Sequence, residues 1–169
     1  MQNIFLIGPM GSGKTTIGRQ LATRLDRKFY DSDREIEKST GVDVALIFEI
    51  EGEEGFRLRE TKMISELAKK QKSVIATGGG SVLSEENRAC IKQNGKVIYL
   101  KSSQEKIFER TFRDKKRPLL ETEDRMATIK ELLEKRGPLY EEIADLIICT
   151  DHRPINQIIN KISQKLSKE

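Results

Sequence analysis

The sequence predicts an α/β fold, a three-layer sandwich in which a five-stranded parallel sheet lies between two layers of helices. Short segments rich in β-branched and aromatic residues alternate with longer segments of helical pattern. This alternation is typical of parallel strands joined by crossover helices. The predicted strands are residues 4–7, 28–30, 73–77, 96–100 and 146–149.

The first predicted helix runs from Lys14 to about Leu25. Its apolar residues Ile17, Leu21 and Leu25 recur at intervals of four, which is the spacing of a helix that covers a sheet. Ligands of such sheets gather at the carboxyl ends of the strands. We therefore expect the loops that follow the strands to carry the function.

The loop after the first predicted strand has the pattern of a phosphate-binding loop. Residues 8–15 read G-P-M-G-S-G-K-T and fit G-x-x-x-x-G-K-[ST] between a strand and a helix. The backbone amides of such a loop surround phosphate groups, the lysine (Lys14) holds the β- and γ-phosphates, and the hydroxyl (Thr15) ligates Mg²⁺. The alternative is an ordinary glycine-rich turn. The strand–loop–helix context favours a bound nucleoside triphosphate.

The composition favours one domain spanning residues 1–169 and argues against several classes of function. The 31 basic and 27 acidic residues nearly cancel to a net charge of +4, and no block of five or more like charges occurs. This pattern argues against a nucleic-acid partner. No apolar run approaches the roughly 18 residues of a membrane span, and the two cysteines lack metal or redox spacing. We therefore expect a cytoplasmic protein with no membrane partner.

Two acids, Asp31 and Asp33, follow the second predicted strand. Residues two apart in an extended chain point to the same side, so both carboxylates would face one cleft. One could reach the metal through water while the other accepts a proton from an attacking hydroxyl, as phosphoryl transfer requires. Alternatively, Asp33 is only the N-cap of the helix that follows it. The local sequence leaves both interpretations open.

Arg57 and a run of three glycines are further candidates. Arg57 lies near the start of a helix predicted from Glu53 to about Lys70, and an arginine fork suits a carboxylate or phosphate. The alternative is a surface ion pair with a neighbouring glutamate. Gly78 to Gly80 follow the third strand, where missing side chains let a ligand approach the backbone. A flexible turn is the alternative for this run.

A basic segment, Arg110 to Arg117, ends before Pro118 and has the composition of a mobile cover that carries positive charge. A phosphoryl-transfer enzyme needs such charge over the γ-phosphate. A solvated basic loop is the competing interpretation. Arg136 precedes Gly137–Pro138, where it could be only a cation favoured at the C-terminal end of a helix.

The order of these motifs resembles the shikimate kinase family over nearly the whole chain. The matching segments are G-P-M-G-S-G-K-T-T-I-G, F-Y-D-S-D, E-G-E-E-G-F-R, A-T-G-G-G-S, K-K-R-P-L-L and R-G-P-L-Y-E-E-I-A-D. The resemblance implies transfer of the γ-phosphoryl group of ATP to the 3-hydroxyl of shikimate, on the route to chorismate and the aromatic amino acids. It also implies a P-loop NTPase fold of the nucleoside-monophosphate kinase type. The single domain would contain a shikimate-binding region at about 31–60 and a mobile lid at about 111–125.

The resemblance also implies roles for individual residues. The ATP phosphates would be bound by Gly11, Ser12, Gly13, Lys14, Thr15 and Thr16, with Thr15 and Asp31 on Mg²⁺ and Arg117 of the lid on the phosphates. Asp33 would hold the shikimate hydroxyls and act as the general base, so that Asp33, Lys14 and Arg117 are the expected catalytic residues. Arg57 and Arg136 would grip the shikimate carboxylate beside the backbone of Gly78, Gly79 and Gly80. Arg153 would lie near the adenine.

Two other functions fit parts of the sequence. A gluconate-type kinase would act on another polyol acid, but such kinases do not share the D-S-D and G-F-R segments. A nucleotide-dependent switch that reads guanine should carry N-K-x-D, which does not occur in this chain. No long apolar surface stripe calls for a partner, so we expect a monomer.

Overall fold

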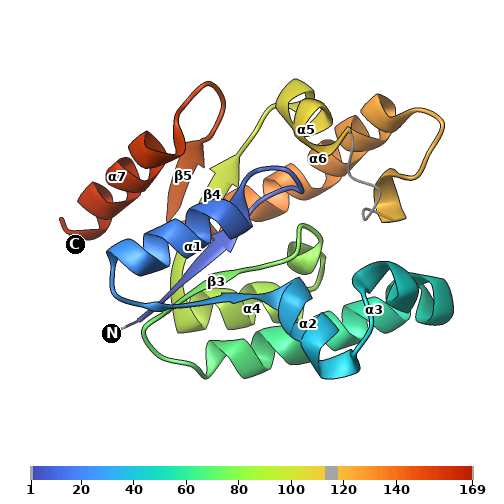
Figure 1. The fold of residues 1–169 in the computed structure, drawn as a ribbon, viewed down its shortest axis with the longest axis horizontal. Helices are drawn as coiled ribbons and strands as arrows, with labels where there is room; N and C mark the ends of the chain where they lie inside the picture. The colour runs from blue at the N-terminus through green and yellow to red at the C-terminus, as the bar shows by residue number, and fades with distance from the viewer. Residues whose placement is uncertain (1, 113–117, 169) are drawn as a thin grey trace.

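The computed structural model describes residues 2–112 and 118–168. Its sheet contains five parallel strands in the order β2-β3-β1-β4-β5 (Figure 1). The strands are β1 Asn3–Ile7, β2 Lys28–Asp31, β3 Ser73–Ala76, β4 Gly95–Lys101 and β5 Leu146–Cys149. The predicted α/β class and all five predicted strands are confirmed, with bounds that differ by at most one residue at each end.

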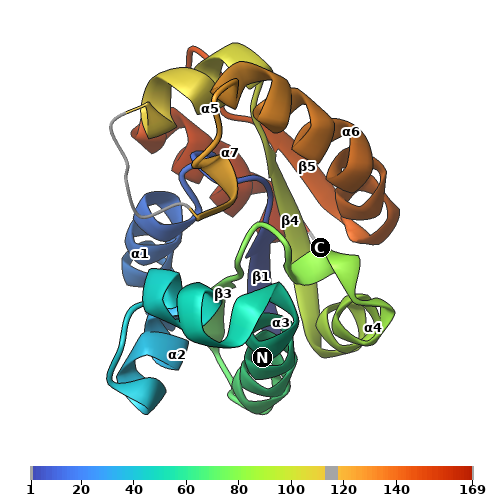
Figure 2. The ribbon, with the colours of Figure 1, turned by 90° about the vertical axis from the view of Figure 1, so that its right-hand side faces the viewer.

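Helices lie on both sides of the sheet (Figure 2). They are α1 Lys14–Arg24, α2 Ser32–Thr40, α3 Val44–Ala68, α4 Glu85–Asn94, α5 Gln104–Thr111, α6 Arg125–Ile143 and α7 Ile155–Leu166, with 3-10 turns η1 Ser81–Leu83 and η2 Pro118–Leu120. Among the described residues, no helix is both long enough and apolar enough to span a bilayer.

Alternate residues of the central strand pack into two separate apolar clusters. Ile4 and Leu6 of β1 contact the helices α1 and α7, whereas Phe5 and Ile7 contact α3, α4 and α6. Successive side chains of a strand point to opposite faces, so one buried strand serves both layers. This arrangement confirms the predicted three-layer sandwich.

Helix α3 begins earlier than the sequence predicts. It starts at Val44, where the Asp43 carboxylate accepts the Leu46 amide at 2.9 Å, rather than at Glu53. A bend at Gly52, with φ of 71°, divides it, because glycine enters this left-handed region without steric cost. The predicted start at Glu53 therefore corresponds to the second part of a longer, bent helix.

The second part of α3 buries one carboxylate together with its apolar face. Phe56, Glu60 and Ile64 recur at intervals of four, and the exposed fraction of Glu60 is 0%. The Oε1 atom of Glu60 lies 2.8 Å from Nη1 of Arg57. Burial raises the pKa of Glu60 above its ordinary value of 4.5, and the opposing effect of Arg57 is smaller.

The raised pKa of Glu60 predicts a specific pH dependence of stability. The Glu60 carboxyl binds its proton more tightly in the folded chain than in the unfolded chain, so protonation of Glu60 stabilises the fold. This stabilisation is complete below about pH 4.5, the ordinary pKa, and is lost as pH rises through the pKa of Glu60 in the folded chain. The test compares the free energy of unfolding of the wild type with that of Glu60→Gln. The wild-type value minus the variant value should increase as pH falls through the range between these two pKa values. Urea unfolding between about pH 5 and about pH 8 measures this difference.

Glu66→Gln provides the matched control, since Glu66 is an exposed glutamate of the same helix. The raised pKa would be contradicted if the difference in free energy of unfolding between the wild type and Glu60→Gln did not depend on pH, or if it decreased on acidification.

Candidate active site

A cavity of about 500 Å³ lies at the carboxyl ends of β1, β2 and β3. Strand ends of a parallel sheet share one edge, so loops distant in sequence meet there. Most of the residues singled out from the sequence line this cavity: Gly11, Gly13, Lys14, Thr15, Thr16, Asp31, Asp33, Arg57, Gly78, Gly79, Gly80 and Arg136. The structure therefore brings the expected phosphate-binding residues and the expected acceptor-binding residues into one site.

The phosphate loop joins β1 to α1. Gly11 and Gly13 adopt φ of 74° and 90°, which glycine tolerates and other residues rarely adopt. The N-cap of α1 is Gly13, which has no side chain to cap the helix, so the first amide groups of α1 are available to an anion. The Lys14 ammonium donates to the carbonyl oxygens of Gly8 and Pro9, both at 2.8 Å, which holds it against the loop.

Oxygen atoms gather beside the phosphate loop. The Thr15 hydroxyl donates to Oδ2 of Asp31 at 2.5 Å. The Ser12 hydroxyl is buried and has no hydrogen-bond partner among the described residues. Thr16 is exposed and lies next to Thr15 on α1. A hydroxyl and a carboxylate oxygen are the kinds of ligand that Mg²⁺ prefers, so Thr15 and Asp31 fit a magnesium site.

The structure corrects the expected placement of Asp31 and Asp33. Because β2 ends at Asp31 and α2 begins at Ser32, the two acids do not lie on one extended segment. Asp31, rather than Asp33, is the N-cap, and its Oδ1 accepts the amides of Asp33 at 3.1 Å and Arg34 at 3.3 Å. A carboxylate in this position satisfies amides of the first helical turn, which explains why the helix begins here. Both acids nevertheless line the cavity.

Arg57 forms ion pairs and also lines the cavity, so the ion-pair interpretation is confirmed, while its binding of a carboxylate or phosphate stays a prediction. Its guanidinium lies between Glu60 and Glu53, with Nη1 2.8 Å from the former and Nη2 3.3 Å from the latter. The Arg57 side chain is 22% exposed. Arg59 pairs instead with Glu51 at 2.6 Å and is not part of the cavity lining. Although they are only two residues apart, Arg57 faces the cavity, whereas Arg59 does not.

Arg136 lies inside helix α6, whereas its position before Gly137–Pro138 predicts a helix end. The helix continues through Pro138, and the next turn is held by Tyr140 and Ile143 in the apolar core. This packing offsets the loss of the proline amide. Arg136 is 3% exposed, and burial lowers the pKa of its guanidinium. It thus presents a buried cation to the cavity rather than a charge at a helix terminus.

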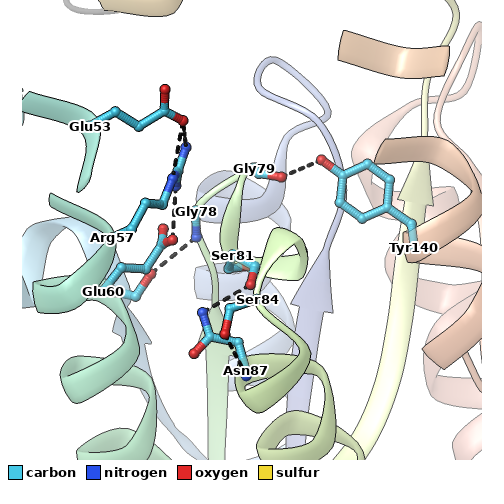
Figure 3. Close-up of polar contacts among 10 residues, drawn as sticks. Glu53, Arg57, Glu60, Gly78, Gly79, Ser81, Ser84, Asn87 and Tyr140 are labelled. Carbon is cyan, nitrogen blue, oxygen red and sulfur yellow. Dashed lines mark hydrogen bonds and ion pairs between the residues drawn. The ribbon is translucent and has the colours of Figure 1, made fainter. Parts of the chain in front are cut away.

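The charged side chains of the cavity pack against the three-glycine loop, Gly78 to Gly80 (Figure 3). A Cβ atom at Gly78 would lie 2.6 Å from Glu60 Oε2 and 2.9 Å from Asp33 Oδ1. A Cβ atom at Gly80 would overlap the guanidinium of Arg57. The sequence predicts that missing side chains let a ligand approach this backbone. At these two positions the space is filled by protein side chains instead.

Glu60 is the residue of this site that the sequence reasoning missed. Its Oε2 atom is buried and has no hydrogen-bond partner among the described residues. The signal was the position of Glu60 four residues after Phe56 and four before Ile64. This spacing places the glutamate on the same apolar helix face as these two residues and predicts that it is buried. Such a group needs a functional or ion-pair partner, and here Arg57 provides one.

The expected lid is described only in part. Arg117 lies outside the described residues, so its expected contact with phosphates stays a prediction. Helix α5 ends at Thr111, and the described chain resumes at η2. Leu119 of this turn lines the cavity. Leu119 therefore borders the site, whereas the expected mobile lid at about 111–125 stays a prediction.

Arg153 is exposed in the loop between β5 and α7 and is not part of the cavity lining. The loop is tied to the start of α5, because the Asp151 carboxylate accepts the Ser103 amide at 3.1 Å. Arg110 of α5 contacts Thr150 at the start of this loop, and its Nη1 atom donates to the Gly11 carbonyl of the phosphate loop at 3.0 Å. The expected position of Arg153 near an adenine stays a prediction.

Comparison with known proteins identifies the family. The family model described as shikimate kinase matches residues 10–167. A shikimate kinase from Shewanella pealeana is 51% identical over 165 residues, covering 98% of this chain and 96% of the relative. The structure of shikimate kinase from Acinetobacter baumannii in complex with shikimate superposes with a TM-score of 0.97 at 46% identity, covering 99% of this chain and 94% of that one.

A gluconokinase from Sinorhizobium meliloti superposes less closely, with a TM-score of 0.61 at 17% identity over 99% of this chain and 92% of that chain. This likeness shows a common fold and nothing narrower, so the gluconate alternative gains no support from it. The family model, the Shewanella relative and the Acinetobacter structure each match nearly the whole length of this chain. The chain therefore belongs to the shikimate kinase family.

Proposed function

We propose that this enzyme transfers the γ-phosphoryl group of ATP to the 3-hydroxyl of shikimate and releases ADP and shikimate 3-phosphate. The observation that carries the proposal is that one cavity is lined by both the phosphate loop and a cluster of acceptor-type charges, Asp33, Arg57 and Arg136. The Acinetobacter relative, whose structure contains shikimate, supports this choice of acceptor. The product would enter the route to chorismate and the aromatic amino acids.

The nucleotide is proposed to bind along the start of α1. The amides from Gly11 to Thr16 and the buried hydroxyl of Ser12 would surround the phosphates, together with the helix N-terminus. Lys14 would exchange its carbonyl partners for β- and γ-phosphate oxygens. This placement stabilises the negative charge that spreads over the transferred group.

Mg²⁺ is proposed to accompany ATP, held by Thr15 and Asp31. No group of three or more His, Cys, Asp or Glu side chains that could hold a metal occurs in the described part of the chain. Two protein oxygens suffice for magnesium at such sites, where phosphates and water supply the other ligands. When bound, the ion neutralises charge on the phosphates.

The acceptor is proposed to lie with its carboxylate toward Arg57 and Arg136 and its ring beside Gly79. Asp33 would then accept the proton of the 3-hydroxyl while that oxygen bonds to the γ-phosphorus and the bond to the ADP oxygen breaks. Arginine suits the far end of the acid, because its planar fork binds a carboxylate through two hydrogen bonds.

The remaining roles are proposed from the family pattern. Arg117 would contact the transferred phosphate from a mobile lid at about 111–125, and Arg153 would lie near the adenine. The shikimate-binding region would span about 31–60 within the single domain. We place the enzyme in the cytoplasm, since its cysteines, Cys90 and Cys149, are free, as is usual in a reducing compartment. It would act as a monomer, because one chain supplies the residues of the cavity.

A coupled ADP-release assay tests the proposed function. Shikimate should stimulate ADP release from ATP, whereas gluconate and single-stranded DNA, added separately, should leave the rate at the level without acceptor. Stimulation by either of these compounds but not by shikimate would overturn the proposal.

Asp33→Asn tests the proposed base. The variant should retain ATP binding but lose at least about 10²-fold in turnover, since removal of a general base typically costs 10² to 10⁴. Asp26→Asn is the control, because Asp26 is exposed in the turn after α1, at the opposite edge of the sheet. Steady-state kinetics and nucleotide titration measure both quantities. Near-normal turnover in Asp33→Asn would exclude this residue as the base.

Arg57→Ala tests the carboxylate clamp. Loss of a charged hydrogen-bond partner costs about 1.5 to 3 kcal/mol, so the KM for shikimate should rise by roughly 10- to 100-fold while the KM for ATP changes little. Arg59→Ala is the matched control, since that neighbouring arginine pairs with Glu51 away from the cavity. Equal effects of Arg57→Ala on both KM values would show that Arg57 is a structural residue.

A further inference from the structure

The three-glycine loop and the residue that follows it form hydrogen bonds with three different helices (Figure 3). The Gly78 amide donates to the Ser32 hydroxyl of α2 at 3.0 Å. The carbonyl of Ser81, just after the loop, accepts Nδ2 of Asn87 in α4 at 2.9 Å. Between them, the Gly79 carbonyl accepts the hydroxyl of Tyr140 in α6. The loop therefore has a defined position relative to the elements around the cavity.

The ring of Tyr140 packs in an apolar cluster, while its hydroxyl lies beside Arg136 and the Gly79 carbonyl. Its exposed fraction is 0%, and it belongs to the core cluster that contains Phe5, Ile7 and Tyr99. Its ring stacks on Tyr99 with the centroids 5.0 Å apart. Like any tyrosine hydroxyl, that of Tyr140 carries its proton at neutral pH and can donate, and burial raises its pKa further, with a smaller opposing effect of Arg136. Phenylalanine would fill the same volume but could not make this bond.

Gly79 lies where the two halves of the cavity meet. A Cβ atom at this position would be 3.3 Å from the Met10 amide nitrogen, 3.6 Å from the Gly8 carbonyl oxygen and 3.5 Å from Nη1 of Arg136. The first two atoms belong to the phosphate loop, and the third belongs to the proposed carboxylate clamp. The position of the Gly79 peptide thus sets the spacing between these two groups.

Arg136 and Tyr140 are four residues apart in α6 and therefore lie on the same face of this helix, one turn apart. One rigid element supplies both the guanidinium that would bind the acceptor and the hydroxyl that holds the Gly79 carbonyl. A shift of α6 relative to the three-glycine loop would break this hydrogen bond.

We infer that Tyr140 is a positioning residue for the acceptor: its hydroxyl fixes the Gly79 peptide in register with Arg136 and the phosphate loop. Tyr140 is not required to touch the substrate, since it acts through Gly79 and Arg136. This inference rests on the proposed function, in which those two residues contact shikimate.

Tyr140→Phe tests the inference, with Tyr99→Phe as the matched control. Tyr99 is 2% exposed in the same cluster, and it loses the same atom in the control. The KM for shikimate should rise roughly 3- to 10-fold in Tyr140→Phe, as expected for the loss of one neutral hydrogen bond, while kcat and the KM for ATP change less than about 2-fold. Tyr99→Phe should leave all three values near those of the wild type.

The pattern of kinetic changes separates positioning from a structural role. A structural role would reduce the fraction of active enzyme, which lowers the apparent kcat and leaves both KM values unchanged; that result would overturn the inference. Loss of the folded state in Tyr140→Phe but not in Tyr99→Phe, measured by circular dichroism, would overturn it as well. Failure of the proposed function is seen separately, because the wild-type enzyme would then not respond to shikimate.

Discussion

One carboxylate, that of Asp31, connects the two halves of the active site. Its Oδ2 atom accepts the Thr15 hydroxyl at 2.5 Å, and its Oδ1 atom accepts the amides of Asp33 and Arg34. The first contact reaches the helix that follows the phosphate loop, and the second orients the helix that carries the proposed base. The Asp31 side chain at the end of β2 therefore helps to set the position of the phosphate loop relative to the proposed base.

The acceptor side of the cavity concentrates charge in a place where burial makes charge unfavourable. Glu60 is 0% exposed and Arg136 is 3% exposed, with the Arg57 side chain beside them. Apolar residues of similar volume are often at least as stabilising as a buried ion pair. Both Glu60 and Glu53 pair with Arg57, whereas Arg136 has no ion pair among the described residues. We interpret the buried charge of Arg136 as stability given up in favour of binding an acidic acceptor.

Sequence patterns predicted those parts of the molecule that neighbouring residues determine. The five strands, the helix after the phosphate loop and the loop itself follow from periodicity and glycine placement. The continuation of α6 through Pro138, the burial of Glu60 and the choice of Asp31 over Asp33 as the cap were not predicted. The continuation of α6 depends on the packing of Tyr140 and Ile143 against elements far away in the sequence. The cap at Asp31 depends on where β2 ends, and the burial of Glu60 had a signal in the spacing of its helix that was not used. Most of the residues that the family resemblance identified line the cavity; Ser12 and Arg153 do not, and Arg117 lies outside the described residues.

The acceptor cannot be determined by the sheet and the phosphate loop, because a gluconokinase shares this fold. Selectivity must come from other side chains of the cavity, and those proposed to bind the acceptor are supplied by three helices: Asp33 by α2, Arg57 by α3, where Glu60 pairs with it, and Arg136 by α6. The nucleotide side, in contrast, is built largely from one continuous segment. A new acceptor would therefore require coordinated substitutions on three helices, whereas the phosphate loop could stay the same. This difference explains why a bound triphosphate follows from local sequence, while the acceptor followed only from resemblance.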